Sequence, residues 1–196
     1  MEYRAIMPTS PFCLDESVLI AKMMLDGKNR REINEFFNEN NLFSAKKQSS
    51  RDKFFGNLYN RLNACSDELK ECLFFEKIAD IRIANLVIIM NYDDLFREFV
   101  LDTYNYCRQR YKPVSDYDLT VFFERKAMES ETVAEWKHDT IKRLSGSFVR
   151  TLRDAGLLTI SAGERKIVSP FISKDLIRSL VDLGYGEYLN AVVDSI

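Results

Sequence analysis

Basic side chains gather at two places along the chain, and contact with phosphate groups is the chemistry that they support. One group lies between residues 137 and 153 and the other between residues 44 and 61, and each segment carries a net charge of +4. The whole chain carries −2, so the remaining residues carry −10. Such segregation concentrates positive potential in two places and favours a polyanionic partner.

The downstream basic segment has the pattern of an amphipathic helix. Apolar residues recur at intervals of three and four, at Ile141, Leu144, Phe148, Leu152 and Ala155. The opposite side carries the cations that we assign to DNA contact, which are Lys142, Arg143, Arg150 and Arg153. Asp139 is suited to cap the start of the helix, and Gly156 is suited to end it in a left-handed conformation.

A β-hairpin is predicted directly after this helix. Residues 157–160 and 166–168 have strand-forming composition and flank a loop at residues 161–165 that contains a glycine. A basic helix followed at once by a hairpin is the outline of a winged helix-turn-helix, in which the helix enters a DNA groove. Arg165 and Lys166 then lie where the wing would contact the DNA backbone.

The basic face alone does not establish a DNA site, because any solvated helix carries charges opposite its apolar stripe. Three features favour DNA nevertheless. Acidic residues are scarce on this helix although the chain is acidic elsewhere, and the hairpin follows immediately. Small side chains that let a helix approach phosphates also lie on it, namely Ser145, Gly146, Ser147 and Thr151.

The upstream basic segment is expected in the third of three N-terminal helices. Asp15 is suited to cap the first helix, Asn29 precedes the second, and Ser44 or Ser49 is suited to cap the third. The early turns of the third helix carry a second set of predicted DNA contacts, which are Lys46, Lys47, Arg51 and Lys53. Three helices with a basic third helix have the shape of a simple helix-turn-helix, although no wing follows them.

The rest of the chain also has helical patterns. Residues 78–90 are apolar nearly all round, as a central helix should be. Asp93 or Asp94 opens the next helix, and Pro113 stops it. A helix capped by Ser115 or Asp116 should turn Leu119, Phe122 and Phe123 inward, with Met128 as a further candidate, and two more helices are expected at residues 174–183 and 188–193.

These elements predict a mainly α protein in three parts. Residues 1–66 form a helix-turn-helix-like segment, residues 67–112 a central helical region, and residues 113–196 a winged-helix region with a short β-hairpin. The low content of glycine (seven) and proline (four) favours helices over a β-sandwich or β-barrel.

Composition places the chain in the cytoplasm, with no membrane association. The longest apolar run is interrupted by Arg82 and Asn85 and falls short of the roughly 20 residues that span a bilayer. Charged residues interrupt the N-terminus where a signal peptide would be apolar. The four cysteines form no CxxC motif and are expected to be small buried residues in a reducing compartment.

Enzyme chemistry has little support in the sequence. The single histidine, His138, lies at the start of the basic helix without a recognisable catalytic partner. No phosphate-binding glycine motif and no zinc-type spacing of cysteine and histidine occurs. Asp93 and Asp94 are better explained as helix caps than as metal ligands. We therefore expect no catalytic residue, metal, cofactor or small-molecule substrate.

Two alternatives to duplex DNA binding remain open from the residues. Aromatic doublets occur at Phe36-Phe37, Phe54-Phe55, Phe74-Phe75 and Phe122-Phe123. On a helix one ring of each doublet can face the core while the other builds an exposed apolar surface, which is typical of an assembly or adaptor protein. The basic faces are also compatible with an RNA-binding helical bundle.

The chain resembles the BrxA family of BREX phage-defence systems over most of its length. The resemblance is carried by Phe12 to Ser17, Asn41-Leu42, Ser49-Ser50, Arg61-Leu62, Phe96 to Phe99, Phe122-Phe123, Lys126, Trp136, Thr140, Lys142, Leu152 to Leu158 and Pro170. It implies a small, mostly helical, non-enzymatic cytoplasmic protein that binds double-stranded DNA and works beside other BREX proteins. It supplies no catalytic residue.

Overall fold

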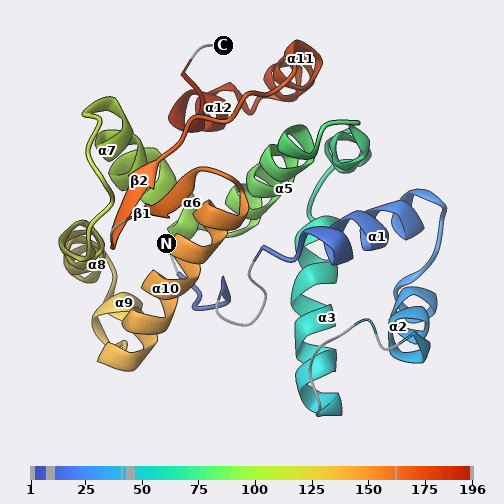
Figure 1. The fold of residues 1–196 in the computed structure, drawn as a ribbon. Helices are drawn as coiled ribbons and strands as arrows, with labels where there is room; N and C mark the ends of the chain where they lie inside the picture. Colours follow the sequence, from blue (N-terminus) through green and yellow to red (C-terminus); the bar gives the residue numbers. More distant parts are fainter. Residues whose placement is uncertain (1–2, 8–11, 41, 43–46, 162, 195–196) are drawn as a thin grey trace.

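Helix α5 (Ile78–Tyr92) lies at the centre of the molecule and contacts helices from both ends of the chain (Figure 1). The computed structural model describes residues 3–7, 12–40, 42, 47–161 and 163–194. Every residue of α5 from Ile83 to Met90 is buried. The prediction of a central helix over residues 78–90 is therefore confirmed.

The N-terminal half is helical. Its elements are α1 (Leu14–Leu25), α2 (Arg30–Glu39), α3 (Gln48–Asn63), α4 (Asp67–Glu71) and the short 3₁₀-helix η2 (Cys72–Phe74). Helix α1 contacts α3, and the ring of Phe37 in α2 lies 6.3 Å from that of Phe55 in α3. These three helices form one side of the molecule, to the right of α5 in Figure 1.

The C-terminal half contains the remaining helices and one antiparallel hairpin. Its elements are α6 (Asp94–Glu98), the π-helix η3 (Phe99–Tyr104), α7 (Asn105–Gln109), α8 (Asp116–Glu129), α9 (Glu131–Ala134), α10 (His138–Asp154), β1 (Leu158–Ser161), β2 (Glu164–Ile167), α11 (Lys174–Asp182) and α12 (Gly186–Val192). The predicted fold class, mainly helical with a C-terminal hairpin, is confirmed at this level.

Three predicted helix caps are wrong. Asp15, Ser49 and Asp139 lie in the first turns of α1, α3 and α10, and each of these helices begins two residues earlier than predicted. The N-cap positions are Cys13, Lys47 and Lys137, none of which makes a side-chain capping bond. The acidic side chains of Asp15 and Asp139 still favour helix starts because they face the positive pole of the helix dipole. The other candidate cap, Ser44, lies outside the described residues.

Two other helix starts match the predicted caps. Asn29 forms a reciprocal capping box with Glu32 at the start of α2. At the start of α8, Ser115 forms the same arrangement with Asp118. These short-range hydrogen bonds are encoded by residues three apart, which is why the sequence pattern reveals them.

The hairpin has a tighter turn than predicted. Leu158 pairs with Ile167 and Ser161 pairs with Glu164, so the strands continue into the segment expected to be a five-residue loop. Gly163 has φ +82°, a left-handed conformation that suits a short turn. Arg165 therefore lies within β2, opposite Ile160, and not in the loop.

Helix α8 buries Lys126, whereas the sequence suggested Met128 as a further inward-facing residue. Met128 is 88% exposed, so its inward placement is wrong, whereas Lys126 is buried beside Leu119, Phe122 and Phe123. Positions 119, 122, 123 and 126 follow the i, i+3, i+4, i+7 spacing of one helix face, and position 128 lies off that face.

The aromatic doublets do not all provide a spare ring. Phe122 and Phe123 are both buried and face Phe148 of α10, with ring centroids 6.4 and 5.8 Å away. The adaptor interpretation of this doublet is therefore wrong. Phe36 and Phe74 are 37% and 42% exposed, so two of the doublets do leave one ring at the surface.

Candidate nucleic-acid interface

Helix α10 is fixed by an aromatic cluster on its buried side. The ring of Phe148 lies 5.1 Å from Phe96 and 5.2 Å from Phe99, and Leu144 and Leu152 are fully buried on the same side. Because this side is packed against α5, η3 and α8, the opposite side of α10 must face solvent. The helix therefore presents its basic side chains in a defined orientation.

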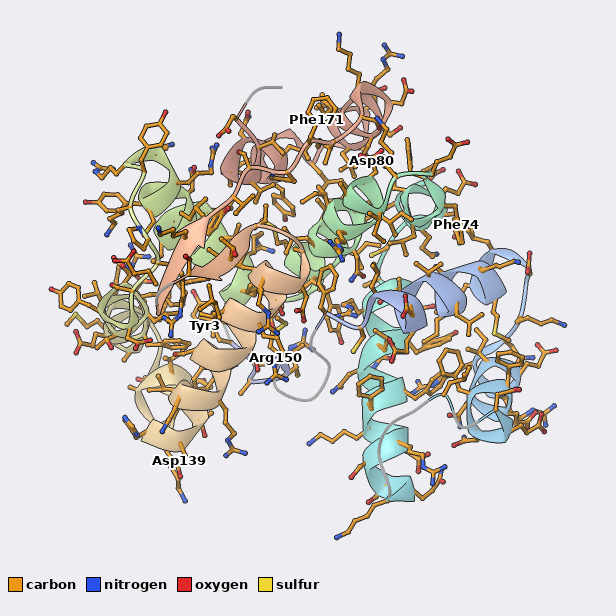
Figure 2. All side chains as sticks on the ribbon, viewed as in Figure 1. Tyr3, Phe74, Asp80, Asp139, Arg150 and Phe171 are labelled. Carbon is orange, nitrogen blue, oxygen red and sulfur yellow. The ribbon has the colours of Figure 1, made fainter. Side chains whose placement is uncertain are left out.

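The four predicted cations of α10 are all exposed. These residues are Lys142, Arg143, Arg150 and Arg153. At about 100° per residue they fall within one arc of roughly 100° on the helix surface. Figure 2 shows Arg150 on the exposed side of α10, with Asp139 near the start of the helix.

These cations differ in the partners that they already have. The Nε of Arg143 donates to the carbonyl of Asp139 at 3.3 Å, and the guanidinium of Arg153 lies 3.4 Å from the Asp154 carboxylate. Lys142 and Arg150 form no ion pair with any residue in the described part of the chain. Their charges are thus the most available on this face.

The hairpin is attached to the start of α8. The backbone N–H of Val114 donates to the carbonyl of Arg165 at 3.1 Å, and the guanidinium of Arg165 lies 2.7 Å from the Asp116 carboxylate. Only 25% of the Arg165 side chain is exposed. Arg165 therefore holds the hairpin against α8 before any ligand arrives.

Lys166 lies on the other face of the hairpin. Successive side chains of a strand point to opposite faces, so Arg165 and Lys166 diverge. Arg165 lines the groove between α8 and α10, whereas Lys166 lines a separate hollow beside Tyr111 and Lys112. The two predicted wing contacts thus belong to two different surfaces.

A groove of about 730 Å³ separates α8 from α10. Its walls are largely apolar, with Leu119 and Phe123 on α8 and Ile141 on α10, and Lys142 and Gly146 lie at its edge. A Cβ atom at Gly146 would meet nothing within 4 Å. This glycine therefore leaves the surface of α10 open for close approach by another molecule.

Comparison with known proteins identifies the family. The sequence model of the BrxA family matches residues 1–184. The chain belongs to the BrxA family. A protein of Bacillus cereus (strain H3081.97) described as "BREX protein BrxA" is 26% identical over 195 residues, which span 97% of this chain and 96% of that protein.

A solved structure shares the fold. The crystal structure of an uncharacterized protein from Magnetospirillum magneticum superposes with a TM-score of 0.81 over 100% of both chains, at 18% sequence identity. At this identity the likeness establishes the fold alone.

The segments that carry the likeness to the BrxA family build the support of α10. In the segment from Phe96 to Phe99, both phenylalanines pack against Phe148. In the segment from Leu152 to Leu158, Gly156 has φ +82° and turns the chain from α10 into the hairpin. These family segments therefore help to position the basic face of α10, and the segment from Leu152 to Leu158 also contains one of its cations, Arg153.

The basic segment of α3 does not form one face. Lys47 and Lys53 are exposed and Arg51 is half-buried, whereas Lys46 lies outside the described residues. Arg51 and Lys53 are two positions apart, which places them about 200° apart around the helix. A single flat ligand therefore cannot contact both side chains equally.

Arg61 was counted with this basic segment but is buried. It is 3% exposed, and one Nη donates to the hydroxyl of Ser17 in α1 at 3.2 Å. Burial lowers the pKa of its guanidinium. The surface charge of the segment is therefore smaller than the sequence suggests, because Arg61 links α3 to α1.

Sequence reasoning missed Tyr111 and Arg110 at the end of α7. The sequence pattern predicts for Arg110 only a favourable charge at the end of a helix, and it predicts no role for Tyr111. The structure places Tyr111 at the surface with 97% of its side chain exposed, between two cations. The run of Arg108, Arg110 and Lys112 around a tyrosine was the signal available in the sequence.

The cysteines are consistent with a structural role. Burial raises the pKa of the Cys13 thiol to about 12 and that of Cys72 to about 11, which keeps both thiols protonated at neutral pH.

Among the described residues no group of three or more His, Cys, Asp or Glu side chains is arranged to hold a metal ion. None of the described helices combines the length and apolarity that crossing a bilayer requires.

Proposed function

We propose that this chain binds double-stranded DNA as a component of a BREX phage-defence system, chiefly through phosphate contacts and with little or modest sequence preference. The observation that carries the proposal is the exposed face of α10, where Lys142 and Arg150 have no ion-pair partner in the described part of the chain. Cations of this kind release counterions when they neutralise phosphates, and this release drives association. The proposed role is binding, without an enzymatic step.

The order of elements supports a winged helix-turn-helix. The backbone bond at Val114 is followed by helices α8, α9 and α10 and then by the β1–β2 hairpin. In proteins with this plan the last helix before the hairpin enters the major groove. We assign that role to α10, with Lys142 and Arg150 as its main phosphate contacts and Arg143 and Arg153 as further contacts on the same face.

The basic start of α3 is proposed as a secondary contact. Lys47 and Lys53 are exposed but lie about 120° apart around the helix axis, so each would contact a separate phosphate or none. We therefore expect α3 to contribute less than α10 to duplex binding. The helix-turn-helix interpretation of residues 1–66 remains a proposal of the same kind.

A second function, docking of another BREX protein, is favoured by apolar side chains near the start of α5. Phe171 is 85% exposed, Ile78 is 55% exposed and Phe74 is 42% exposed. Figure 2 shows Phe171 and Phe74 in the upper part of the molecule, remote from Asp139 at the start of α10. A partner bound there would leave the basic face free, so the two functions are compatible.

A salt titration of duplex binding tests the DNA proposal. Fluorescence anisotropy of a labelled duplex should give a linear fall of log affinity with log salt. The double variant Lys142→Ala/Arg150→Ala should flatten this slope by about one to two units, because each cation neutralises about one phosphate. The matched control is Lys174→Ala/Arg178→Ala, which removes two exposed cations from α11.

Four outcomes decide between the alternatives. Equal slopes for the Lys142/Arg150 variant and the wild type would exclude α10 as the contact, and absence of duplex binding at low salt would exclude the proposal as a whole. Preferential competition by structured RNA would instead identify an RNA-binding bundle. Retention of other BREX proteins by the Lys142/Arg150 variant in co-purification would support the docking function.

A further inference from the structure

The end of helix α7 adopts a backbone geometry that normally requires glycine. The N–H of Tyr111 donates to the carbonyl of Arg108 at 3.0 Å, and the N–H of Lys112 donates to that of Cys107 at 3.1 Å. This pair of bonds is the Schellman motif, whose C′ residue is left-handed. Tyr111 occupies the C′ position with φ +53°.

Three other helices end with the same pair of bonds and use glycine. Gly27 follows α1, Gly156 follows α10 and Gly184 follows α11, with φ between +77° and +87°. A Cβ atom at any of the three would meet nothing within 4 Å, so backbone conformation and not space explains the glycine. Tyrosine at the fourth position therefore carries backbone strain that glycine would avoid.

The side chain of Tyr111 makes no packing contribution that could offset this strain. It is 97% exposed, the highest exposure among the large hydrophobic side chains in the described part of the chain. A bulky aromatic residue that is both strained and exposed is better explained by contact with another molecule than by folding. Its neighbours indicate the chemistry of that molecule.

Cations flank this tyrosine in the sequence, and both lie over the ring of the neighbouring Tyr106. The Arg110 guanidinium lies 3.8 Å from the centre of the Tyr106 ring, and the Lys112 ammonium lies 4.9 Å from it. Arg110 and Lys166 form no ion pair with any described residue. Lys112 bonds to Asp118 at 2.6 Å, so its charge is partly neutralised.

A hollow of about 430 Å³ lies between this helix end and the hairpin. Its lining includes Tyr111, Lys112 and Lys166, together with the acidic Glu164 and Asp194. Asp194 pairs with Arg108 at 2.9 Å, which leaves Glu164 as the acid without an ion pair among the described residues. The hollow thus combines the exposed Tyr111 with one cation, Lys166, and one acid, Glu164, that form no ion pair with any described residue.

We propose that this surface, formed by Tyr111, Arg110, Lys112 and Lys166 on the hairpin face opposite α10, binds unpaired nucleotides of single-stranded DNA. Single-strand sites combine cations that follow the backbone with exposed rings on which bases stack, and any base can stack. Paired bases offer no free face to Tyr111 except at a duplex end. The hairpin then separates a duplex contact on the α10 side from a single-strand contact on the other side.

This proposal rests on the proposed duplex binding, because the two contacts would meet where double-stranded DNA continues into a single strand. Measurements of DNA binding by the whole chain test it. The probes are a blunt duplex, the same duplex with a single-stranded thymidine extension, and the single strand alone. The wild type should bind the extended duplex about 5- to 10-fold more tightly than the blunt one, which corresponds to one stacked base. Tyr111→Gly should lose this gain, bind the blunt duplex normally and have an unchanged or raised Tm.

Two further variants separate stacking from folding. Tyr111→Phe keeps the ring and should retain the gain, whereas Tyr117→Ala removes a 75% exposed tyrosine from α8 and should also retain it. Equal affinity of the wild type for blunt and extended duplexes would overturn the proposal, as would a gain that survives in Tyr111→Gly. Single-strand binding that depends on Tyr111 without any duplex binding would support this site while excluding the proposed duplex function.

Discussion

Asp93 shows how one buried carboxyl couples folding to pH. Its Oδ1 accepts the N–H of Phe96 at 3.0 Å at the start of α6, and the residue is 5% exposed. Burial raises the pKa of this carboxyl to about 6, because the charged form loses its hydration. The folded protein therefore binds this proton more tightly than the unfolded chain does.

The pH dependence that follows has a definite sign. The contribution of Asp93 to stability is fully present below about pH 4, the ordinary pKa of aspartate, and is lost as the pH rises through about 6. Asp93→Asn keeps the capping oxygen but cannot titrate. Urea denaturation should show the wild type losing about 2–3 kcal/mol relative to this variant between pH 4 and pH 7. Parallel pH curves would contradict the assignment.

Gly156 controls the junction between α10 and the hairpin at the scale of the element. Its φ of +82° is strained for any L-residue, although the space around it is open. Gly156→Ala should therefore lower the free energy of unfolding by about 1 kcal/mol, measured by chemical denaturation.

A second glycine on the same element provides the control. Gly146 lies in the interior of α10 without a left-handed φ, and its surroundings are also open. Gly146→Ala should raise stability by about 0.5–1 kcal/mol, because alanine favours the helix. If both variants changed the free energy of unfolding in the same direction, the left-handed turn would not be the reason for glycine at position 156.

Lys126 joins three distant parts of the molecule. Its ammonium contacts the carboxylates of Glu98 in α6 and Glu129 in α8, the latter at 2.6 Å, and the hydroxyl of Tyr3 donates to Glu98 at 2.8 Å. Burial alone would lower the pKa of Lys126, but the hydrogen bonds to Glu129 and Glu98 raise it above its ordinary value. Figure 2 places Tyr3 beside the C-terminal half, where this network holds it.

Removal of this cation should destabilise the whole fold. Lys126→Met leaves Glu98 beside Tyr3 without its counter-ion and should cost about 2–3 kcal/mol in urea denaturation, less than for a fully buried pair because both carboxylates are partly exposed. Glu129→Gln retains the bond to Glu98 and should cost less than about 1 kcal/mol. Equal losses in the two variants would contradict a role for the link to Glu98.

Helix α5 connects the two halves through polar groups as well as apolar ones. The amide of Asn85 donates to the carbonyl of Phe12 at 2.7 Å, and the carboxylate of Asp80 accepts the N–H of Ser173 at 2.8 Å. One cluster of buried apolar residues extends from Tyr3 to Val193. The division at residues 66 and 112 remains a prediction, because each half contacts the same central helix.

The sequence by itself determined most of the local structure. The apolar stripes of α8 and α10, the central run of α5, the capping boxes of Asn29 and Ser115 and the glycine after α10 all depend on residues within one or two turns of each other. Such short-range relations are visible in the order of residues. They also place Lys142 and Arg150 correctly opposite the buried stripe.

Only the tertiary structure decided which charges are available. The sequence predicted Arg165 as a DNA contact and counted Arg61 in the charge of the upstream segment, yet Arg61 is buried against α1 and Arg165 is paired with Asp116. The tertiary structure also identified Tyr111 as a candidate binding residue, because it has a left-handed backbone and an almost fully exposed side chain beside the hairpin. The physical reason is that the availability of a charge depends on its hydration and its partners, and folding brings those partners from distant parts of the chain.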